Sequence, residues 1–128
     1  MRVATYRAPN LVFTEHEFEL PLDHAQPGGP TITVFAREVV TPAREHDDLP
    51  WLVYLQGGPG FEAPRLLKLI EDTWWERALQ DYRLLLLDQR GTGRSAPIGV
   101  LPDMSATEQA EYLTHFRADS IVRDAEAV

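Results

Sequence analysis

Residues 51–60 read Trp-Leu-Val-Tyr-Leu-Gln-Gly-Gly-Pro-Gly, and residues 82–95 read Tyr-Arg-Leu-Leu-Leu-Leu-Asp-Gln-Arg-Gly-Thr-Gly-Arg-Ser. In each stretch a short, nearly continuous apolar run passes directly into a glycine-rich loop. A run of this length between turn residues is typical of a strand that is covered on both faces. The two stretches therefore predict two buried strands, each followed by a loop at its carboxyl end.

The segment between these strands carries apolar residues at helical spacing. Leu67, Ile70, Trp74 and Ala78 recur on one side, and Pro64 stands where a proline in the first turn of a helix is tolerated. The pattern predicts a helix with Trp74 in the core. Strand, helix and strand together make a βαβ unit.

The flanking segments extend this α/β pattern. Residues 13–20 and 31–40 alternate between apolar and polar residues around a turn at 27–30, which predicts an antiparallel pair of strands. Residues 105–108 form a capping box that opens a helix, and another helix is expected from about Asp119. The second helix reaches the last residue without a stop signal, so the sequence is expected to be cut inside it.

Composition limits the possible functions. The chain has 128 residues, 20 of them acidic and 12 basic, and its formal net charge of -8 would repel nucleic-acid phosphate. It has no cysteine, which excludes disulfides and thiolate chemistry. No signal-peptide core or membrane-spanning stretch is visible, so we expect a cytoplasmic chain with no membrane partner.

The histidines show no metal-ligand spacing. His16, His24 and His46 fall on or beside predicted surface segments and are expected to be solvated. We therefore predict no metal site and no cofactor.

The first loop, Gln56-Gly57-Gly58-Pro59-Gly60, has the composition of an oxyanion-binding loop. Its glycines let the backbone approach a ligand closely and direct amide N–H groups at it. The alternative is an ordinary tight turn between strand and helix, which also favours glycine and proline.

Taken together, the two loops and their strands resemble the prolyl aminopeptidases, a family of serine peptidases with the α/β-hydrolase fold. The likeness extends upstream to the segment that begins Leu-Val-Phe-Thr-Glu-His at Leu11, and so covers nearly all of residues 1–128. The family typically has His-Gly-Gly-Pro-Gly in the first loop, and Gln56 departs from that pattern. The resemblance implies that these residues are the N-terminal portion of a catalytic domain, ending before the strand that carries the nucleophile.

The resemblance also implies roles for individual residues. Gly57 and Gly58 would belong to the oxyanion-hole loop, with Gly58 as the preferred N–H donor and Gln56, Pro59 and Gly60 supporting it. Asp88, Arg90 and Arg94 would form a charged group that holds loops around the active site, the alternative being a solvated turn with one salt bridge. The nucleophile, acid and base would all lie outside these residues.

Two other readings of the sequence fail on context. Ser95, Asp103 and His115 occur in the hydrolase order, but Pro97 stands where the glycine of a nucleophile elbow belongs. Residues 91–96 match a dinucleotide-binding fingerprint, yet Pro97 breaks the helix that the fingerprint requires.

Two classes of function follow. The favoured class is a fragment of a hydrolase that releases N-terminal proline from peptides, inactive by itself and prone to self-association. The alternatives are a fragment of another α/β-hydrolase, such as an esterase or amidase, and a non-catalytic interaction module.

Overall fold

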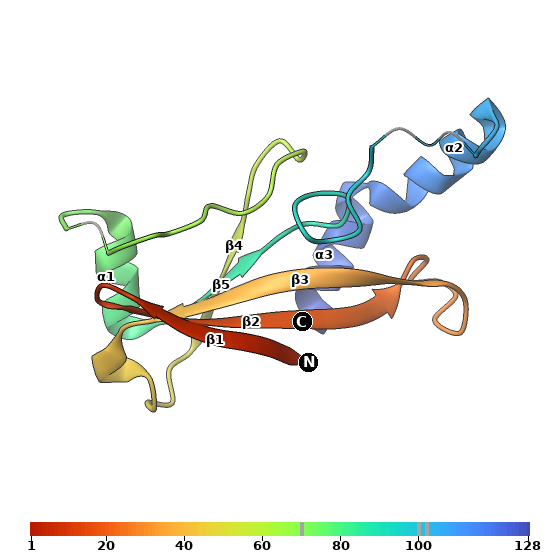
Figure 1. Cartoon of the computed structure of the whole chain (residues 1–128). Coiled ribbons are helices and arrows are strands. Elements are labelled where there is room, and N and C mark those ends of the chain that lie inside the picture. The colour runs from red at the N-terminus through yellow and green to blue at the C-terminus, as the bar shows by residue number, and fades with distance from the viewer. Residues whose placement is uncertain (70, 100, 102) are drawn as a thin grey trace.

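The computed structural model describes residues 1–69, 71–99, 101 and 103–128. Its centre is a five-stranded mixed sheet with the strand order β1-β2-β3-β5-β4 (Figure 1). The strands are β1 (Arg2–Ala8), β2 (Leu11–Pro21), β3 (Thr31–Val40), β4 (Trp51–Leu55) and β5 (Arg83–Leu87). The helices are α1 (Trp74–Asp81), α2 (Ala106–Leu113) and α3 (Ala118–Ala127), with short 3₁₀ turns η1 (Pro42–Arg44) and η2 (Thr114–Phe116).

The antiparallel part of the sheet has one strand more than predicted. The expected pair is present as β2 and β3, whose register runs from Val12 opposite Val40 to Pro21 opposite Thr31. A further strand that was not predicted, β1, pairs with β2 across a turn where Asn10 has a φ of 62°. Because β1 lies at the sheet edge and is mostly exposed, it carries little of the apolar pattern that marks a core strand.

The predicted βαβ unit is also present, with β4 and β5 parallel and α1 between them. β5 is buried as expected, because it lies between β3 and β4. The prediction that β4 is covered on both faces is wrong. On one of its faces Trp51, Val53 and Leu55 are exposed. The position of β4 at the edge of the sheet, by contrast, is expected from the resemblance, in which the strand beyond it lies outside these residues.

The helix α1 is shorter than predicted. Leu67 is 79% exposed and lies outside any helix, while Ile70 lies outside the described residues. Asp72 has a left-handed φ of 56°, so a right-handed helix cannot pass through it and α1 cannot begin earlier. Thr73 is the N-cap of α1, and its side chain accepts a hydrogen bond from the Glu76 N–H. The expectation that Trp74 is a core residue is wrong as well, because half of it is exposed.

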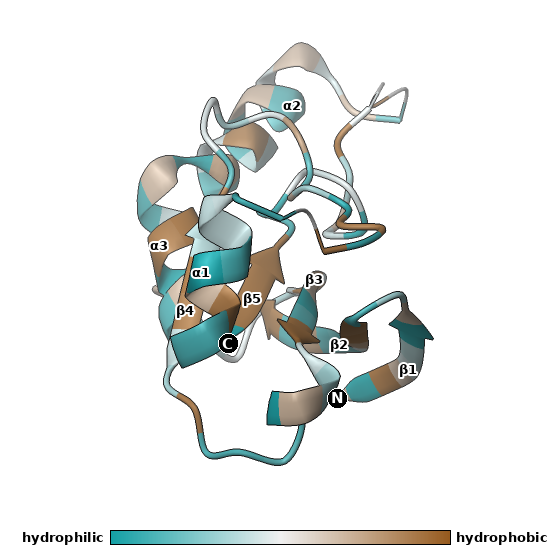
Figure 2. Ribbon diagram, turned by 90° about the vertical axis from the view of Figure 1, so that its left-hand side faces the viewer, coloured by the Kyte–Doolittle hydropathy of each residue, from teal (hydrophilic) through white to brown (hydrophobic). Residues whose placement is uncertain are grey.

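The two faces of the sheet have separate apolar cores. One core lies between the sheet and α1, and it includes Phe13, Leu79 and Leu86. The other includes Val34 and Leu87, and α3 contributes to it through partly buried residues at its end. Neighbouring positions of β5 thus face opposite cores, so its last four residues, 84–87, are all leucine (Figure 2).

The C-terminal helices follow the predicted signals. Ser105 accepts from the Glu108 N–H and Glu108 accepts from the Ser105 N–H, so the capping box at the start of α2 is confirmed. The second helix, α3, begins at Ala118 and buries Ile121. No helix in the described part of the chain is long and apolar enough to cross a membrane.

Candidate functional site

The glycine-rich loop lies at the carboxyl end of β4. Gly57 to Gly60 are exposed, and Gly58 and Gly60 have φ values of 129° and 158°. A φ of 129° is one that residues with a Cβ rarely adopt, so the backbone at Gly58 requires glycine. The loop is held at its start, where the Gln89 Nε2 group donates to the Gln56 carbonyl at 2.7 Å.

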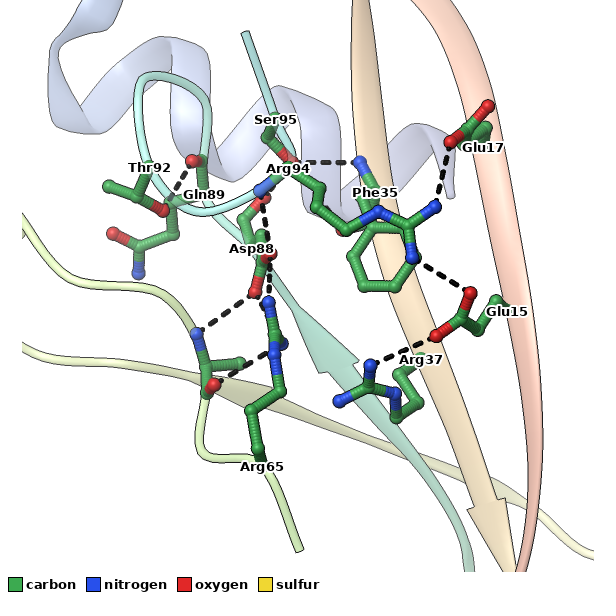
Figure 3. A network of polar contacts seen from close by, with 11 residues as sticks. Glu15, Glu17, Phe35, Arg37, Arg65, Asp88, Gln89, Thr92, Arg94 and Ser95 are labelled. Carbon is green, nitrogen blue, oxygen red and sulfur yellow. Dashed lines mark hydrogen bonds and ion pairs between the residues drawn. The ribbon is translucent and has the colours of Figure 1, made fainter. Parts of the chain in front are cut away.

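Asp88, directly after β5, connects the two loop regions through its carboxylate. It is fully buried and accepts from the backbone N–H groups of Ala63 and Arg94, each at 3.0 Å. It also accepts a bidentate bond from the Arg65 guanidinium at 2.9 and 2.6 Å (Figure 3). A carboxylate with this many donors holds the segment after β4 against the loop after β5.

Gly93 allows the loop to close around this carboxylate. It has a φ of 51°, and a Cβ at this position would lie 2.2 Å from the Asp88 Oδ2 atom and 2.7 Å from the Glu62 Cβ atom. No other residue fits there without moving the backbone.

Arg90 belongs to the second loop, residues 88–95, and its side chain is buried, with 2% of the residue exposed. It forms a bidentate ion pair with Asp124 of α3, with both distances at 2.6 Å. It also donates to the backbone carbonyls of Pro21, Leu22 and His115. One guanidinium therefore connects the β2–β3 turn, the loop after β5 and the C-terminal helices.

Arg94 points toward the antiparallel strands (Figure 3). It donates to Glu15 at 2.7 Å and Glu17 at 3.1 Å on β2, and its guanidinium lies 4.0 Å from the centre of the Phe35 ring. Glu15 also accepts from Arg37 at 2.9 Å. Asp88, Arg90 and Arg94 thus hold three different parts of the chain to the second loop.

Three groups here have displaced pKa values. Burial raises the pKa of Glu15, but hydrogen bonds from Arg94 and Arg37 outweigh it, and the net pKa lies below its ordinary value. The hydrogen bond to Asp88 raises the pKa of Arg65, and the hydrogen bond to Glu15 raises that of Arg94. All three shifts favour the charged forms of these side chains.

Ser95 has a structural environment rather than that of a nucleophile. Its side chain is fully buried, and its Oγ atom donates to the Asp88 carbonyl at 2.6 Å and accepts from the Phe35 N–H at 2.7 Å. No helix begins within residues 91–96, where Gly91 and Gly93 instead form left-handed turns. The loop therefore lacks the helix start that a dinucleotide fingerprint needs.

The expectation that the histidines are solvated holds for His46 alone. His46 is exposed, whereas the His16 Nε2 atom lies 2.8 Å from Glu38, and the His24 Nε2 atom lies 2.7 Å from Asp124. Both partners are distant in the sequence. No local spacing could have revealed these contacts.

Arg65, Gln89 and Asp124 also belong to this region, although no sequence pattern predicted them. Arg65 falls in the segment predicted to be a helix. Asp124 is a charged residue in a predicted helix, and nothing in the local pattern shows that its side chain is buried. Gln89 lies inside the second motif, directly after Asp88, and this position was the only feature of the sequence that could have marked it as part of the site.

The two loops meet at a common hollow. Pro59 and Gly60 of the first loop and Gly91 and Thr92 of the second line a cavity of about 250 Å³, together with Phe116. Ligands of open α/β sheets bind beyond the carboxyl ends of the strands. The arrangement defines an α/β protein with a candidate ligand site at that edge.

Comparison with known proteins finds two similar sequences. The chain is 56% identical over 116 residues to a proline iminopeptidase of Aeromonas sobria, a match that covers 88% of this chain and 27% of the relative. It is 43% identical over 120 residues to the proline iminopeptidase aneH of Aspergillus aculeatus, covering 90% of this chain and 26% of that protein. No family model matches.

The resemblance to the proline iminopeptidases, another name for prolyl aminopeptidases, is thereby confirmed over about nine tenths of the chain. The chain spans about a quarter of the length of these relatives.

Proposed function

We propose that this chain is the N-terminal part of a prolyl aminopeptidase with the α/β-hydrolase fold, a serine hydrolase that releases N-terminal proline from peptides. The observation that carries the proposal is the sequence identity of 56% to a protein named proline iminopeptidase. The strand order, with parallel β4 and β5 ending in two adjoining loops, supports the fold.

In this proposal the loop Gln56–Gly60 supplies the oxyanion hole. Its glycines are exposed at the strand end, where backbone N–H groups can reach the carbonyl oxygen of a substrate. Asp88, Arg90 and Arg94 keep the loops in place and take no part in proton transfer. The nucleophilic serine, the acid and the histidine come from residues beyond these 128.

The test uses the complete reading frame that contains this chain. We expect the purified protein to hydrolyse proline p-nitroanilide, to lose that activity with a serine-directed phosphonate, and to carry a Gly-x-Ser-x-Gly motif after Val128. The 128-residue chain should release no product, because an oxyanion donor without a nucleophile and a base leaves nothing to attack the carbonyl.

Three results would change the assignment. Hydrolysis of esters or other amides with no activity on proline substrates would indicate another α/β-hydrolase. A stop codon directly after Val128 would favour an interaction module. Phosphonate-sensitive turnover by the 128-residue chain would return Ser95 to consideration.

A further inference from the structure

Among the described residues of the second loop, Gln89 is the one whose side chain forms a hydrogen bond with the glycine loop, residues 56–60. Its Nε2 atom lies 2.7 Å from the carbonyl oxygen of Gln56, the residue that precedes Gly57. Because a carbonyl only accepts hydrogen bonds, the amide NH₂ group must face it, which fixes the orientation of the Gln89 carboxamide. The carboxamide points away from Asp88 (Figure 3).

This bond determines the direction of the first N–H group of the loop. The peptide unit between Gln56 and Gly57 is planar and trans, so its N–H points opposite to its carbonyl. Holding the carbonyl toward Gln89 turns the Gly57 N–H away from Gln89. The orientation of this peptide plane also fixes the position of the Gly57 Cα atom, from which the backbone continues to Gly58.

The surroundings of Gln89 make it a rigid support. The residue is 5% exposed, and its backbone carbonyl accepts from both the N–H and the Oγ1 hydroxyl of Thr92, at 3.0 and 2.8 Å. It follows Asp88, whose carboxylate is held by Arg65. A donor on such a framework can hold the Gln56 carbonyl, at the start of the glycine-rich loop, without moving itself.

Stability alone does not account for a glutamine at this position. The Gln89 Oε1 atom is buried and has no hydrogen-bond partner among the described residues. Burying an unpaired amide oxygen costs free energy, which an apolar side chain of similar volume would avoid. The single bond to the Gln56 carbonyl is what the apolar side chain could not supply.

We infer that Gln89 is a positioning residue that directs the backbone N–H groups of the glycine loop toward the substrate oxyanion. The inference rests on the proposed function, and it assigns to Gln89 no contact with the substrate. It separates the role of Gln89 from that of Asp88, which holds the loops together through Ala63 and Arg65.

The test compares Gln89→Leu and Gln89→Glu in the complete protein. Both remove the donor, and the second keeps the length and shape of the side chain. Gln109→Leu is the matched control, because the Gln109 Nε2 group also donates to loop carbonyls, those of Leu101 and Met104, at 3.1 Å. It therefore reports the cost of losing the same kind of bond elsewhere.

We expect both Gln89 variants to lower kcat for proline p-nitroanilide roughly 10- to 100-fold, less than the loss of about 10²–10³ that follows removal of an oxyanion donor. KM and the affinity for the product proline should stay near the wild-type values. Affinity for a prolyl boronate, which forms a tetrahedral adduct, should fall in parallel with kcat. Gln109→Leu should change none of these.

A kcat of either folded Gln89 variant within twofold of wild type would overturn the inference, and so would a rise in KM at unchanged kcat. A second readout is independent of catalysis. With ¹⁵N-glycine labelling, the Gly57 amide resonance should move in Gln89→Glu and stay in place in Gln109→Leu. If the wild-type protein fails to hydrolyse proline substrates, the proposed function fails, whereas an unmoved Gly57 resonance refutes the positioning role.

Discussion

Asp88 shows how one buried side chain organises both loops. All of its contacts are charge-assisted, and Arg65, whose side chain is 30% exposed, is its ion-pair partner. Replacing Asp88 by asparagine keeps the size of the side chain but leaves Arg65 without a counter-charge. Removing one partner of a buried ion pair is far more costly than removing a surface pair.

We expect Asp88→Asn to lower the free energy of unfolding by about 3 kcal/mol, the lower end of the range for buried pairs, because Arg65 is partly solvated. Urea denaturation of the complete protein measures it. Asp81→Asn, which breaks the exposed pair with Arg77, is the control and should cost under about 1 kcal/mol. Equal losses in the two variants would contradict the view of Asp88 as the connecting group.

Glu15 gives a prediction about pH. Its pKa in the folded state lies below the ordinary value of 4.5, because hydrogen bonds from Arg94 and Arg37 outweigh the effect of burial. A depressed carboxyl pKa contributes stability above the ordinary pKa, and that contribution is lost as the pH falls through the folded-state pKa.

In Glu15→Gln this contribution is absent at every pH. The stability difference between wild type and Glu15→Gln should therefore be largest near neutral pH and shrink below about pH 4.5. Urea denaturation at a series of pH values measures it, with Glu126→Gln on the exposed side of α3 as control. A difference that stays constant down to pH 3 would show that Glu15 does not titrate in this way.

The glycine loop allows its N–H donors to be tested one at a time. At Gly57 a Cβ meets nothing within 4 Å, so alanine fits, and proline differs from alanine by removing the N–H and by fixing φ at about −65°. In the complete protein Gly57→Pro should lower kcat about 10²–10³-fold if that N–H binds the oxyanion, and Gly57→Ala should not.

Gly58, the preferred donor, requires a different comparison. Proline and alanine are both strained at its φ of 129°, so Gly58→Pro must be compared with Gly58→Ala after near-UV circular dichroism has shown that both fold. A kcat of Gly58→Pro that equals that of Gly58→Ala would remove Gly58 from the oxyanion hole.

At the scale of elements, α2 depends on its cap more than on packing. All but two of its residues are exposed, and none is buried, so the capping box of Ser105 and Glu108 supplies much of what keeps its first turn together. Ser105→Ala should cost about 1 kcal/mol of local stability. Faster amide exchange confined to the first turn of α2 would show it, while Thr107→Ala, an exposed change in the same turn, should leave the exchange unaltered.

β4 differs from the inner strands because one of its edges is unpaired in the part of the chain that the structure describes. It pairs with β5 on one side and with no strand on the other among the residues that the structure describes. Trp51, Val53 and Leu55 form an exposed apolar row beside this free edge. Neither charge nor proline interrupts the strand, although natural sheets usually protect their edges in such ways.

At the scale of the whole molecule, we therefore predict that the isolated 128-residue chain associates through the β4 edge. Size-exclusion chromatography with light scattering should give a mass above the 14.5 kDa of one chain. Val53→Lys, which places a charge in the exposed row, should reduce the association, and so should extension to the complete protein. A stable 14.5 kDa monomer with cooperative unfolding would show that the chain is a self-sufficient domain.

Local signals in the sequence determined the two motif-bearing strands, the β2–β3 pair and the start of α2. Apolar runs, alternation and a capping box act over a few residues, so they are legible without any knowledge of distant contacts. The resemblance to the proline iminopeptidases rested on the same short motifs, and comparison with Aeromonas sobria and Aspergillus aculeatus proteins confirmed it.

The tertiary structure alone decided where α1 begins, how exposed β4 is and which partners the charged residues have. Leu67 has helical spacing but no helix, because the nearby backbone at Ala63 and the side chain of Arg65 bond to Asp88, 25 and 23 residues further along the chain. Arg90 and Asp124 likewise meet across 34 residues. Such contacts form only when the whole sheet brings the loops together, so no local pattern could predict them.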